Sequence, residues 1–555
     1  MSTSFSVLSK LRPRPVNLLR LLWCLSLLWF ELGTFYHHVS QCYWPDHTVR
    51  FHDTDVATVT ETKATHVLLV ADPQILDQGS YPGRDPALMW ISQRIVDLNM
   101  RRSWRATQTM NPDVIIFLGD LMDRGRFALS DAEYETYYQR FKSIFSMKKD
   151  IPVYYIPGNH DIGLGNPSLF SPSSYDRFES HFAPLNQHVN IANHSFVMIN
   201  APGLVDEDGH RKLESASYVH WAAAMPGGPI EFIRSQEDNS EIPTILLTHI
   251  PLARPEKTDC GPLREKGTIR QGVGFGYQNT LPDDATKFVL ESLRPSAIFS
   301  GDDHDYCEYW HSVPGINGAK AKEISVKSFS MAMGIKVPGF QLLSLFPPKG
   351  TSGQSFFDAP CFLPNQLGIY LTVYVPFIFL SLAALLVSNY YRVKASDQVQ
   401  RYWASGDAGE SGSATNSYLD AGAWRATTPT TMDDSQMLLR KVNEPPSEDE
   451  AEEEDGEAYS LPVPGSTTRR TFPRNSRTCS KSWSFVLFGR RRRMTVDSSC
   501  LSSSILSPFF YVEGRSPESF RRIRVGFFRG FLRDVFDVAW IAVVLFALIA
   551  WWTFL

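Results

Sequence analysis

Four short polar motifs constrain this chain most, because each stands directly after a run of apolar residues typical of a buried strand. The motifs are Asp72-Pro73-Gln74, Gly119-Asp120-Leu121-Met122-Asp123-Arg124, Gly158-Asn159-His160-Asp161 and Gly301-Asp302-Asp303-His304. An isolated His249 follows a further apolar run between the last two motifs. Carboxylate, amide and imidazole groups from successive strand ends suit a site for two divalent cations, about 3.5–4 Å apart, that acts on phosphate esters.

Residues 61–345 have the pattern of a folded domain. Short apolar runs predict strands at 65–71, 113–118, 153–156, 196–200, 244–248 and 297–300. Between the first two runs, Leu88, Ile91, Ile95 and Leu98 recur at helical spacing, and helices are also expected at 131–148 and 283–293. Alternation of strands and helices favours an α/β layered fold. In such folds ligands bind at the carboxyl ends of the strands.

Three further stretches are long enough to cross a membrane, which takes about 20 apolar residues. They are expected at 16–36, 367–389 and 537–555. The first could also be a cleaved signal peptide, but no small-residue cleavage site follows it, so a retained anchor is favoured. Basic residues precede the first and third spans and follow the second. The N-terminus and 390–536 are therefore expected in the cytosol, and 37–366 in a lumen or outside.

The remaining segments are expected to connect or extend these parts. They are a cytosolic N-terminus at 1–15, linkers at 37–60 and 346–366, a segment at 390–520 and a basic juxtamembrane segment at 521–536. Residues 390–520, with an acidic run at 448–457 and a basic run at 490–493, are expected to be disordered. Residues 521–532 favour either a helix along the membrane surface or an ordinary basic flank. The net charge of −5 offers no basic footprint for nucleic acid.

Four cysteines fall in the segment expected to face an oxidising space: Cys42, Cys260, Cys307 and Cys361. Cys42 lies six residues after the first span and Cys361 six residues before the second. Packing of these spans would bring the two thiols to one membrane face and favour a Cys42–Cys361 disulfide, with Cys260–Cys307 as the complementary pair. The sequence alone does not fix this connectivity. Asn193, in Asn193-His194-Ser195, is a glycosylation sequon in the same segment.

The residue types suggest metal-binding roles. Asp72 can bind one cation, and Asp120, with two carboxylate oxygens, can bridge two. Asn159 offers an amide oxygen to the second cation. A lone histidine such as His249 is more often structural, so its role as a ligand depends on the other motifs. His304 closes the set.

Other residues suggest roles in catalysis. His160 is suited to protonate a leaving oxygen, with Asp161 orienting its ring. Asp123 and Arg124 either support the site from behind the ligands or form a charge pair at a helix entry. Tyr277 and Gln278, in the glycine-rich stretch 272–280, offer hydrogen bonds to a substrate. A plain flexible loop explains that stretch equally well.

In this order, the motifs resemble those of the calcineurin-like metallophosphoesterase superfamily: D-x-H, G-D-x-x-D, G-N-H-D, a lone H and G-H-x-H. With its membrane spans, the chain is most similar to the fungal cell division control protein 1 group, which is related to an animal phosphoesterase that remodels glycosylphosphatidylinositol (GPI) anchors. The resemblance covers about residues 60–345 and the spans. It implies a sandwich of two mixed β-sheets flanked by helices. It also implies removal of ethanolamine phosphate from a mannose of GPI-anchored proteins or GPI lipid, in the ER or Golgi membrane.

Two positions depart from the superfamily pattern. Gln74 and Asp302 stand where histidines are usual, and Asp303 or Asp305 could take the place of Asp302. By resemblance, one metal ion takes Asp72, Gln74, Asp120 and His304, and the other takes Asp120, Asn159, His249 and Asp302. Exchange of imidazole for oxygen donors favours harder ions such as Mn²⁺ or Mg²⁺, so two Mn²⁺ ions are the expected cofactors.

Two other functions stay open on this evidence. A lumenal phosphatase for proteins or lipid head groups would use the same site, because one fold serves many substrates. A non-enzymatic metal-binding scaffold would use the 390–520 segment to recruit partners. The presence of His160 and of a full set of metal ligands argues against the scaffold.

Overall fold

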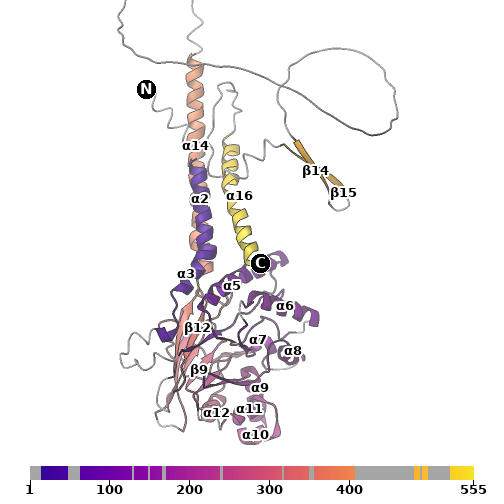
Figure 1. Ribbon diagram of the computed structural model, residues 1–555, viewed down its shortest axis with the longest axis vertical. Coiled ribbons are helices and arrows are strands. Elements are labelled where there is room, and N and C mark those ends of the chain that lie inside the picture. Colours follow the sequence, from indigo (N-terminus) through magenta and orange to yellow (C-terminus); the bar gives the residue numbers. More distant parts are fainter. Residues whose placement is uncertain are drawn as a thin grey trace, which may run out of the picture. The chain divides into compact units, whose positions relative to one another are not determined.

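The computed structural model describes residues 14–47, 63–127, 130–147, 150–165, 170–237, 242–315, 318–348, 355–406, 480–487, 490–497 and 526–554. The chain divides into two compact units. The first unit comprises Met1–Val393 and Arg524–Leu555, and the second comprises Lys394–Ile523. The first unit contains the two large β-sheets, the helices around them and the helical stem, meaning the three long apolar helices (Figure 1).

Two mixed sheets form the centre of the first unit (Figure 1). The first has the order β13 (Phe356–Phe362), β12 (Gly339–Leu345), β1 (Thr65–Val70), β2 (Val114–Phe117) and β3 (Val153–Tyr155). The second has the order β10 (Cys307–Ser312), β11 (Lys320–Ser325), β9 (Ala297–Ser300), β6 (Thr244–Leu247), β5 (His194–Met198) and β4 (Gln187–Ile191). Strands β1, β2 and β3 are parallel, as are β5, β6, β9 and β11. All six predicted strands are present, and the expected sandwich of two mixed sheets is confirmed.

Alternation along the strands divides the apolar side chains between two faces of each sheet. Leu69 of β1 and Phe299 of β9 belong to one core shared by the two sheets. Leu68, the neighbour of Leu69, turns to a second core that includes residues of α5, α6 and α8. Ile298, the neighbour of Phe299, turns to a third core with residues of α9, α11 and α12. The result is a four-layered arrangement with helices outside both sheets.

The helices of the domain are α5 (Pro86–Thr107), α6 (Asp131–Ile144), α7 (Asn159–Ile162), α8 (Ser174–His181), α9 (Ala201–Leu213), α10 (Tyr218–Ala224), α11 (Pro229–Ser235) and α12 (Asp283–Leu293). Helix α5 begins where Asp85 caps the backbone N–H groups of Ala87 and Leu88 and Pro86 occupies the first turn. The structure therefore contains the helices predicted near 88–98, 131–148 and 283–293.

Three helices in the described ranges are long and apolar enough to cross a membrane: Pro15–Ser40, Gln366–Val399 and Phe527–Phe554. The first comprises α2 (Arg14–Leu28), the π-helical turn η1 (Trp29–Gly33) and α3 (Thr34–Ser40). The second comprises α13 (Gln366–Ile369), the π-helical turn η5 (Tyr370–Tyr374) and α14 (Val375–Gly406), and the third is α16 (Phe527–Phe554).

Several predicted boundaries need correction. Residues 346–366 are not a plain linker, because β13 adds an edge strand to the first sheet; its Pro360 is tolerated at an edge. Helix α14 continues to Gly406, so 390–406 is helical, and no proline or glycine interrupts the sequence between Pro376 and Gly406. Residues 527–532 belong to α16 itself.

The second unit contains described strands. Strands β14 (Ser480–Leu487) and β15 (Arg490–Asp497) pair antiparallel within the segment expected to be disordered. The basic run at 490–493 therefore starts a strand. The acidic run at 448–457, like most of the 390–520 segment, lies outside the described residues.

One buried ion pair joins the stem to the domain. Glu31 of η1 is fully buried and pairs with Arg102 of α5, whose side chain is also buried. From the second span, Gln366 donates to Glu31 Oε1 at 3.2 Å and the Tyr374 hydroxyl donates to it at 2.8 Å. Removing one partner of a buried ion pair leaves an uncompensated charge, so this carboxylate ties two spans and the domain together.

Two disulfides are formed in the structure. Cys42 and Cys361 are joined with a Cα separation of 5.6 Å, which links the residues after the first span to β13. Cys260 and Cys307 are joined with a Cα separation of 4.3 Å, which links a loop to the start of β10. Both pairings are those that the sequence suggested.

The Arg102→Ala substitution is expected to destabilise the protein by about 3–5 kcal/mol, because Glu31 would stay buried without its cation. A thermal melt in detergent, followed by tryptophan fluorescence, should show a clear fall in midpoint. The control Lys287→Ala removes an exposed ion pair with Glu291 and should change stability by less than about 1 kcal/mol. Equal midpoints for the two variants would contradict the anchoring role of Glu31 and Arg102.

Candidate metal centre

Polar residues from five strand ends meet between the two sheets. In the first sheet, Asp72 follows β1, Asp120 follows β2, and Asn159 opens α7 soon after β3. In the second sheet, His249 follows β6, and Asp302 and His304 follow β9. Parallel strands direct their carboxyl ends to one edge of a sheet, which is why residues far apart in sequence come together here.

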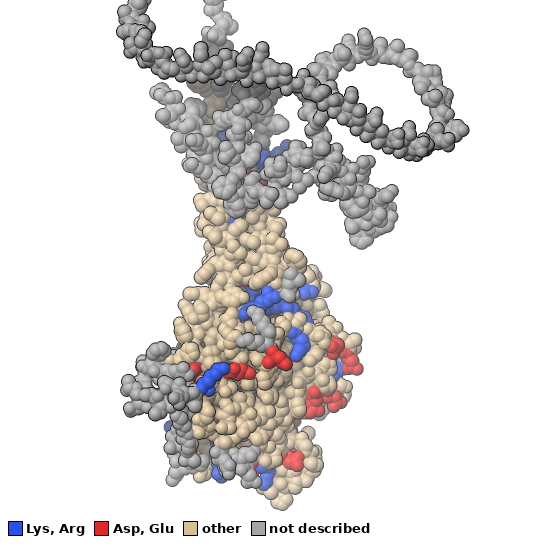
Figure 2. All heavy atoms as spheres, in the orientation of Figure 1, with Lys and Arg blue, Asp and Glu red and all other residues tan. Residues whose placement is uncertain are grey.

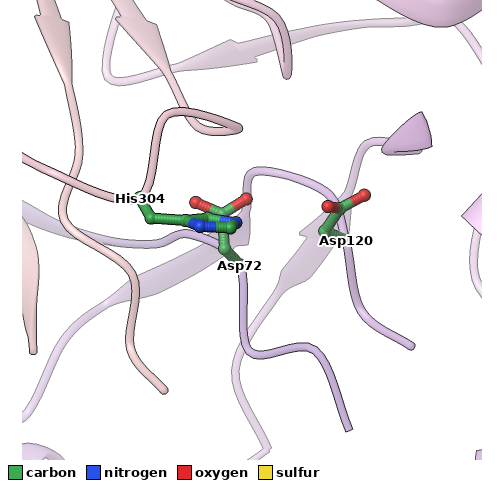
Figure 3. A group of neighbouring side chains, drawn as sticks. All are labelled: Asp72, Asp120 and His304. Atoms are coloured by element: carbon green, nitrogen blue, oxygen red, sulfur yellow. The ribbon is translucent and has the colours of Figure 1, made fainter. Parts of the chain in front are cut away.

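Two sets of side chains in the described residues could each hold a metal ion. The first ligand group is Asp72, Asp120 and His304, and the second ligand group is Asp120, His249 and Asp302. Within each group, the ligand atoms lie within 4.8 Å of one another. Figure 3 shows the first ligand group, with the His304 ring beside Asp72 and the Asp120 carboxylate reaching in from the neighbouring strand end. Asp120 is common to both groups.

The two oxygens of Asp120 face different neighbours. Its Oδ2 accepts a hydrogen bond from Gln74 Nε2 at 2.6 Å. Its Oδ1 lies 3.2 Å from His249 Nε2 and accepts a hydrogen bond from the His160 backbone N–H at 2.9 Å. A carboxylate placed in this way can bind one ion with each oxygen.

The orientation of His249 suits a metal ligand. Its Nδ1 lies 2.8 Å from the carbonyl oxygen of Leu118 and donates to it. Its Nε2 is then left facing the site, 3.1 Å from Asn159 Oδ1 and 3.6 Å from Asp302 Oδ1. Metal-binding histidines usually donate their other ring N–H to a carbonyl or carboxylate in this manner. This fully buried side chain therefore has a defined direction.

The two amide side chains are oriented differently. Asn159 Nδ2 donates to the Gly276 carbonyl oxygen at 2.7 Å, which turns Oδ1 toward His249. Gln74 instead turns its nitrogen inward: Nε2 lies 2.6 Å from Asp120 Oδ2 and 3.3 Å from His304 Nε2. The sequence predicted an oxygen ligand at Gln74, and that role requires a half-turn of its amide group.

The charge balance of the site fits divalent cations. Burial raises the pKa of Asp72 well above its usual range. The charge of His249 lowers this pKa, and the nearby negative charge of Asp120 raises it further. Burial likewise raises the pKa of Asp302 to about 7. The fully buried Asp72 Oδ2 has no hydrogen-bond partner among the described residues. Buried carboxylates this close cannot all stay ionised without added positive charge, and two metal ions would provide it.

Backbone strain is concentrated at the proposed ligands. Asp72, Asp120, Asp302 and His304 have φ values of +47°, +51°, +64° and +64°, and Gln74 has +37°. Residues other than glycine rarely adopt this region, and each such residue costs about 1–3 kcal/mol. The surrounding strands and loops must therefore hold these ligands in place before any ion binds.

Two motif glycines allow the close approach of the ligands. A Cβ at Gly119, where φ is +93°, would lie 2.4 Å from His249 Nδ1. A Cβ at Gly158 would lie 2.1 Å from Asp120 Oδ1. No side chain fits at either position without displacing a ligand.

The predicted role of Asp161 is wrong. Its carboxylate accepts hydrogen bonds from the backbone N–H groups of Leu121, Met122 and Gly158, at 2.9, 3.1 and 2.9 Å. These contacts fix the second motif against the third. The carboxylate is engaged by backbone donors rather than by the His160 ring, because α7 directs it back toward its own N-terminus.

Asp123 is the partner of His160. The Nδ1 atom of His160 lies 2.5 Å from the Asp123 carbonyl oxygen and 3.3 Å from its carboxylate. Burial lowers the pKa of His160, but the negative charges of Asp120 and Asp123 outweigh it and raise the pKa to about 9. These carboxylates therefore favour the protonated ring in the metal-free site. Its side chain is 26% exposed, so a substrate can reach it.

Of the two roles predicted for Arg124, the structure shows the ion pair, although its partner is Asp77 rather than Asp123. Arg124 pairs with Asp77 at 3.6 Å and lies over the Phe127 ring. The buried Arg126 takes the inner position, and its guanidinium donates to the carbonyl oxygens of Asn159 and Gly276 at 3.1 and 2.8 Å. Sequence reasoning missed Arg126, whose signal was a second arginine two residues after the motif.

The glycine-rich stretch reaches the site through its backbone. The Gly276 carbonyl oxygen binds both Asn159 and Arg126. Tyr277 and Gln278 form the short strand β8 (Tyr277–Gln278), which pairs with β7 (Val273–Gly274). Tyr277 is exposed, and Gln278 Nε2 donates to the Thr280 carbonyl oxygen.

The register of the last motif is defined by ion pairs. Asp303 pairs with Arg264, with one nitrogen to oxygen distance of 3.1 Å. Asp305 pairs with Lys327 at 3.0 Å. Asp302 is therefore the carboxylate of this motif that belongs to the second ligand group, while Asp303 and Asp305 have cationic partners.

The sequon lies away from this cluster in sequence and in structure. Asn193 is exposed in the turn between β4 and β5, where its φ is +58°. A glycan would be tolerated there. Its presence stays a prediction.

Residues 65–306 match the family model described as Calcineurin-like phosphoesterase. The chain is similar to "Cell division control protein 1" from Saccharomyces cerevisiae, at 36% identity over 342 residues, which covers 60% of this chain and 65% of that protein's length. It is also similar to "Metallophosphoesterase 1 homolog" from Caenorhabditis elegans, at 27% identity over 377 residues, which covers 67% of this chain and 92% of that protein. A solved dimetal phosphatase from Danio rerio aligns with a TM-score of 0.29 at 13% identity, covering 54% of this chain and 99% of that chain.

Substitutions around the cluster should separate metal binding from proton transfer. Asp120→Asn is expected to lose bound metal, measured by plasma mass spectrometry, because both ligand groups share this charge.

His160→Ala should keep its metal and lower turnover of an aryl phosphodiester with a poor leaving group by roughly 10²–10⁴-fold. Asp123→Ala should keep metal and lower turnover less, because the Asp123 carbonyl oxygen still binds the ring.

Arg124→Ala is the matched control for this series, because Arg124 pairs with Asp77 instead of the cluster. Its metal content and turnover should stay close to those of the unmodified protein. Loss of turnover as large in Arg124→Ala as in His160→Ala would contradict the assigned roles.

Proposed function

We propose that this chain is a membrane-anchored phosphodiesterase that uses two divalent metal ions. Its residues 65–306 match the family model described as Calcineurin-like phosphoesterase. The observation that carries this proposal is the position of Asp120, whose carboxylate belongs to both ligand groups. When bound, two such ions activate a water molecule and stabilise the charge that develops on the phosphate.

In this proposal, His160 donates the proton that the leaving oxygen needs. Its Nδ1 lies 2.5 Å from the Asp123 carbonyl oxygen and 3.3 Å from the Asp123 carboxylate, so Asp123 orients the ring. Arg126 and the Gly276 carbonyl oxygen keep Asn159 in position beside it. A leaving sugar alkoxide is a strong base, so a nearby proton donor accelerates its departure.

We propose ethanolamine phosphate on a mannose of the GPI glycan as the substrate group. Support comes from the resemblance of the motifs and spans to the fungal group. The similarity to proteins named cell division control protein 1 and metallophosphoesterase 1 is consistent with this. The stem keeps the domain at a membrane, where GPI lipids and GPI-anchored proteins are held. Tyr277 and Gln278 are proposed to contact the glycan.

We propose that the domain faces the lumen of the ER or Golgi. Two observations support this orientation. The domain contains two disulfides, Cys42–Cys361 and Cys260–Cys307, and such bonds persist in oxidising compartments. The basic residues beside the spans also favour a cytosolic N-terminus. Asn193 would then be available for glycosylation.

Mass analysis of GPI glycans tests the substrate. Cells that lack the protein should accumulate glycans with one additional ethanolamine phosphate on mannose. The unmodified chain should remove it after re-expression, and the His160→Ala variant should not. Identical glycans with and without the protein would rule out this substrate, while activity of the purified protein on an aryl phosphodiester would still support a phosphodiesterase.

Manganese is the proposed cofactor, because Gln74 and Asp302 supply an amide and a carboxylate in place of two usual imidazoles. Metal-free protein is expected to recover most activity with Mn²⁺, with excess Zn²⁺ as a competitor. The double change Gln74→His with Asp302→His should shift the preference toward zinc or iron. Best recovery of the unmodified protein with Zn²⁺, and no shift in the double variant, would contradict this explanation.

A further inference from the structure

One face of α5 packs against the end of the third span. Arg101 lies over the Phe554 ring at 5.0 Å, and Arg105 lies over the Trp552 ring at 5.0 Å. The Arg105 guanidinium also donates to the Trp552 carbonyl oxygen at 3.1 Å, so it caps the last turn of α16. The second half of α5 therefore lies against the end of a membrane-spanning helix (Figure 1).

The same face continues, uncovered, through the first half of α5. Arg94 precedes Arg101 by seven residues, which is about two helical turns, so both project from one side. Trp90 and Ile91 lie one turn earlier beside Arg94 and are 54% and 43% exposed, and the adjacent Leu88 is 57% exposed. The sequence pattern of Leu88, Ile91, Ile95 and Leu98 predicted the helix correctly, yet Leu98 alone of these four is buried.

A single guanidinium connects this exposed stretch to the end of the span. Arg94 lies 5.6 Å from the Trp90 ring and 5.6 Å from the Phe554 ring. Trp90 therefore stands at the level of the last turn of α16. At that level Trp551 and Trp552 are also exposed. Tryptophans mark the interface between lipid and water at the ends of membrane spans.

The opposite side of α5 already serves the domain. Met89, Val96, Met100 and Trp104 are buried in the core on the outer face of the first sheet. The exposed apolar residues are thus a second apolar surface on one helix. Arginines border it, and Figure 2 shows Lys and Arg side chains gathered on the domain just below the helical stem. This combination of tryptophan, aliphatic and arginine side chains is typical of helices that lie in a membrane interface.

We propose that the first half of α5, through Leu88, Trp90, Ile91 and Arg94, lies in the head-group region of the bilayer that the stem crosses. The apolar side chains enter the boundary of the acyl chains, and the arginines bind head-group phosphates. Continuity with α16 and the arginine border favour phospholipid over a protein partner. The domain is then held against the bilayer at a point beyond the spans.

Depth measurements in lipid nanodiscs test this proposal with the full chain. Cys24, Cys479 and Cys500 are first replaced by serine, which leaves the two disulfides intact. Trp90→Cys or Ile91→Cys is then labelled with an environment-sensitive NBD dye. Leu213→Cys is the control, because Leu213 ends α9 and is 84% exposed. Nitroxide-labelled phosphatidylcholine serves as the quencher.

Dyes at positions 90 and 91 are expected to show blue-shifted emission and several-fold stronger quenching by nitroxide lipid than the dye at 213. Equal emission and quenching at all three positions would overturn the proposal. A blue shift without lipid quenching would also overturn it, because a second copy of the chain would then cover this face. Two labelled positions guard against one variant that fails to fold.

A consequence for activity rests on the proposed function. Trp90→Ser with Ile91→Ser should lower turnover of GPI substrate in a bilayer several-fold and leave turnover of a soluble aryl phosphodiester unchanged. An equal fall with both substrates would contradict a role for this face at the membrane. If the unmodified protein hydrolyses neither substrate, the proposed function fails, and the depth measurement still decides where α5 lies.

Discussion

Excess negative charge in a buried space is the constraint on which this site depends. Asp72, Asp120 and Asp302 converge from two different sheets, and Asp120 stands between two sets of ligands. Such a cluster would oppose folding if nothing compensated it. Three features keep the cluster in place. The ligands have left-handed backbone, and Asp161 accepts hydrogen bonds from three backbone N–H groups. A main-chain carbonyl oxygen fixes the His249 ring. Two divalent cations at these ligands would complete the balance.

The sequence was sufficient for features that depend on local patterns. Apolar runs ending in Asp72, Asp120 or His249 predicted both the strands and the edge where their ends meet, because chain direction fixes which end carries the polar residue. It was insufficient where two side chains compete for one partner. Asp161 adjoins His160 in sequence, whereas Asp123 belongs to a motif 37 residues earlier. The direction in which α7 turns Asp161 is a tertiary property. The amide orientation of Gln74 has the same origin.

Helix α5 gives a second example of this limit. Its spacing of apolar residues predicted a helix, but a helix with two apolar faces does not reveal which face meets the protein. Met89 and Met100 face the sheet that carries Asp72 and Asp120, while Trp90 and Ile91 do not. Arg102 of the same helix reaches Glu31 in the stem. One helix thus links the strands that carry the proposed metal ligands to the helices that are long and apolar enough to cross a membrane.

Anomalous X-ray diffraction from manganese-loaded protein tests the central claim most directly, because it locates each ion without reference to activity. Two peaks about 3.5–4 Å apart are predicted, one beside Asp72 and His304 and the other beside His249 and Asp302, with Asp120 between them. A single peak that does not touch Asp120, or peaks at Asp303 and Asp305, would contradict the account.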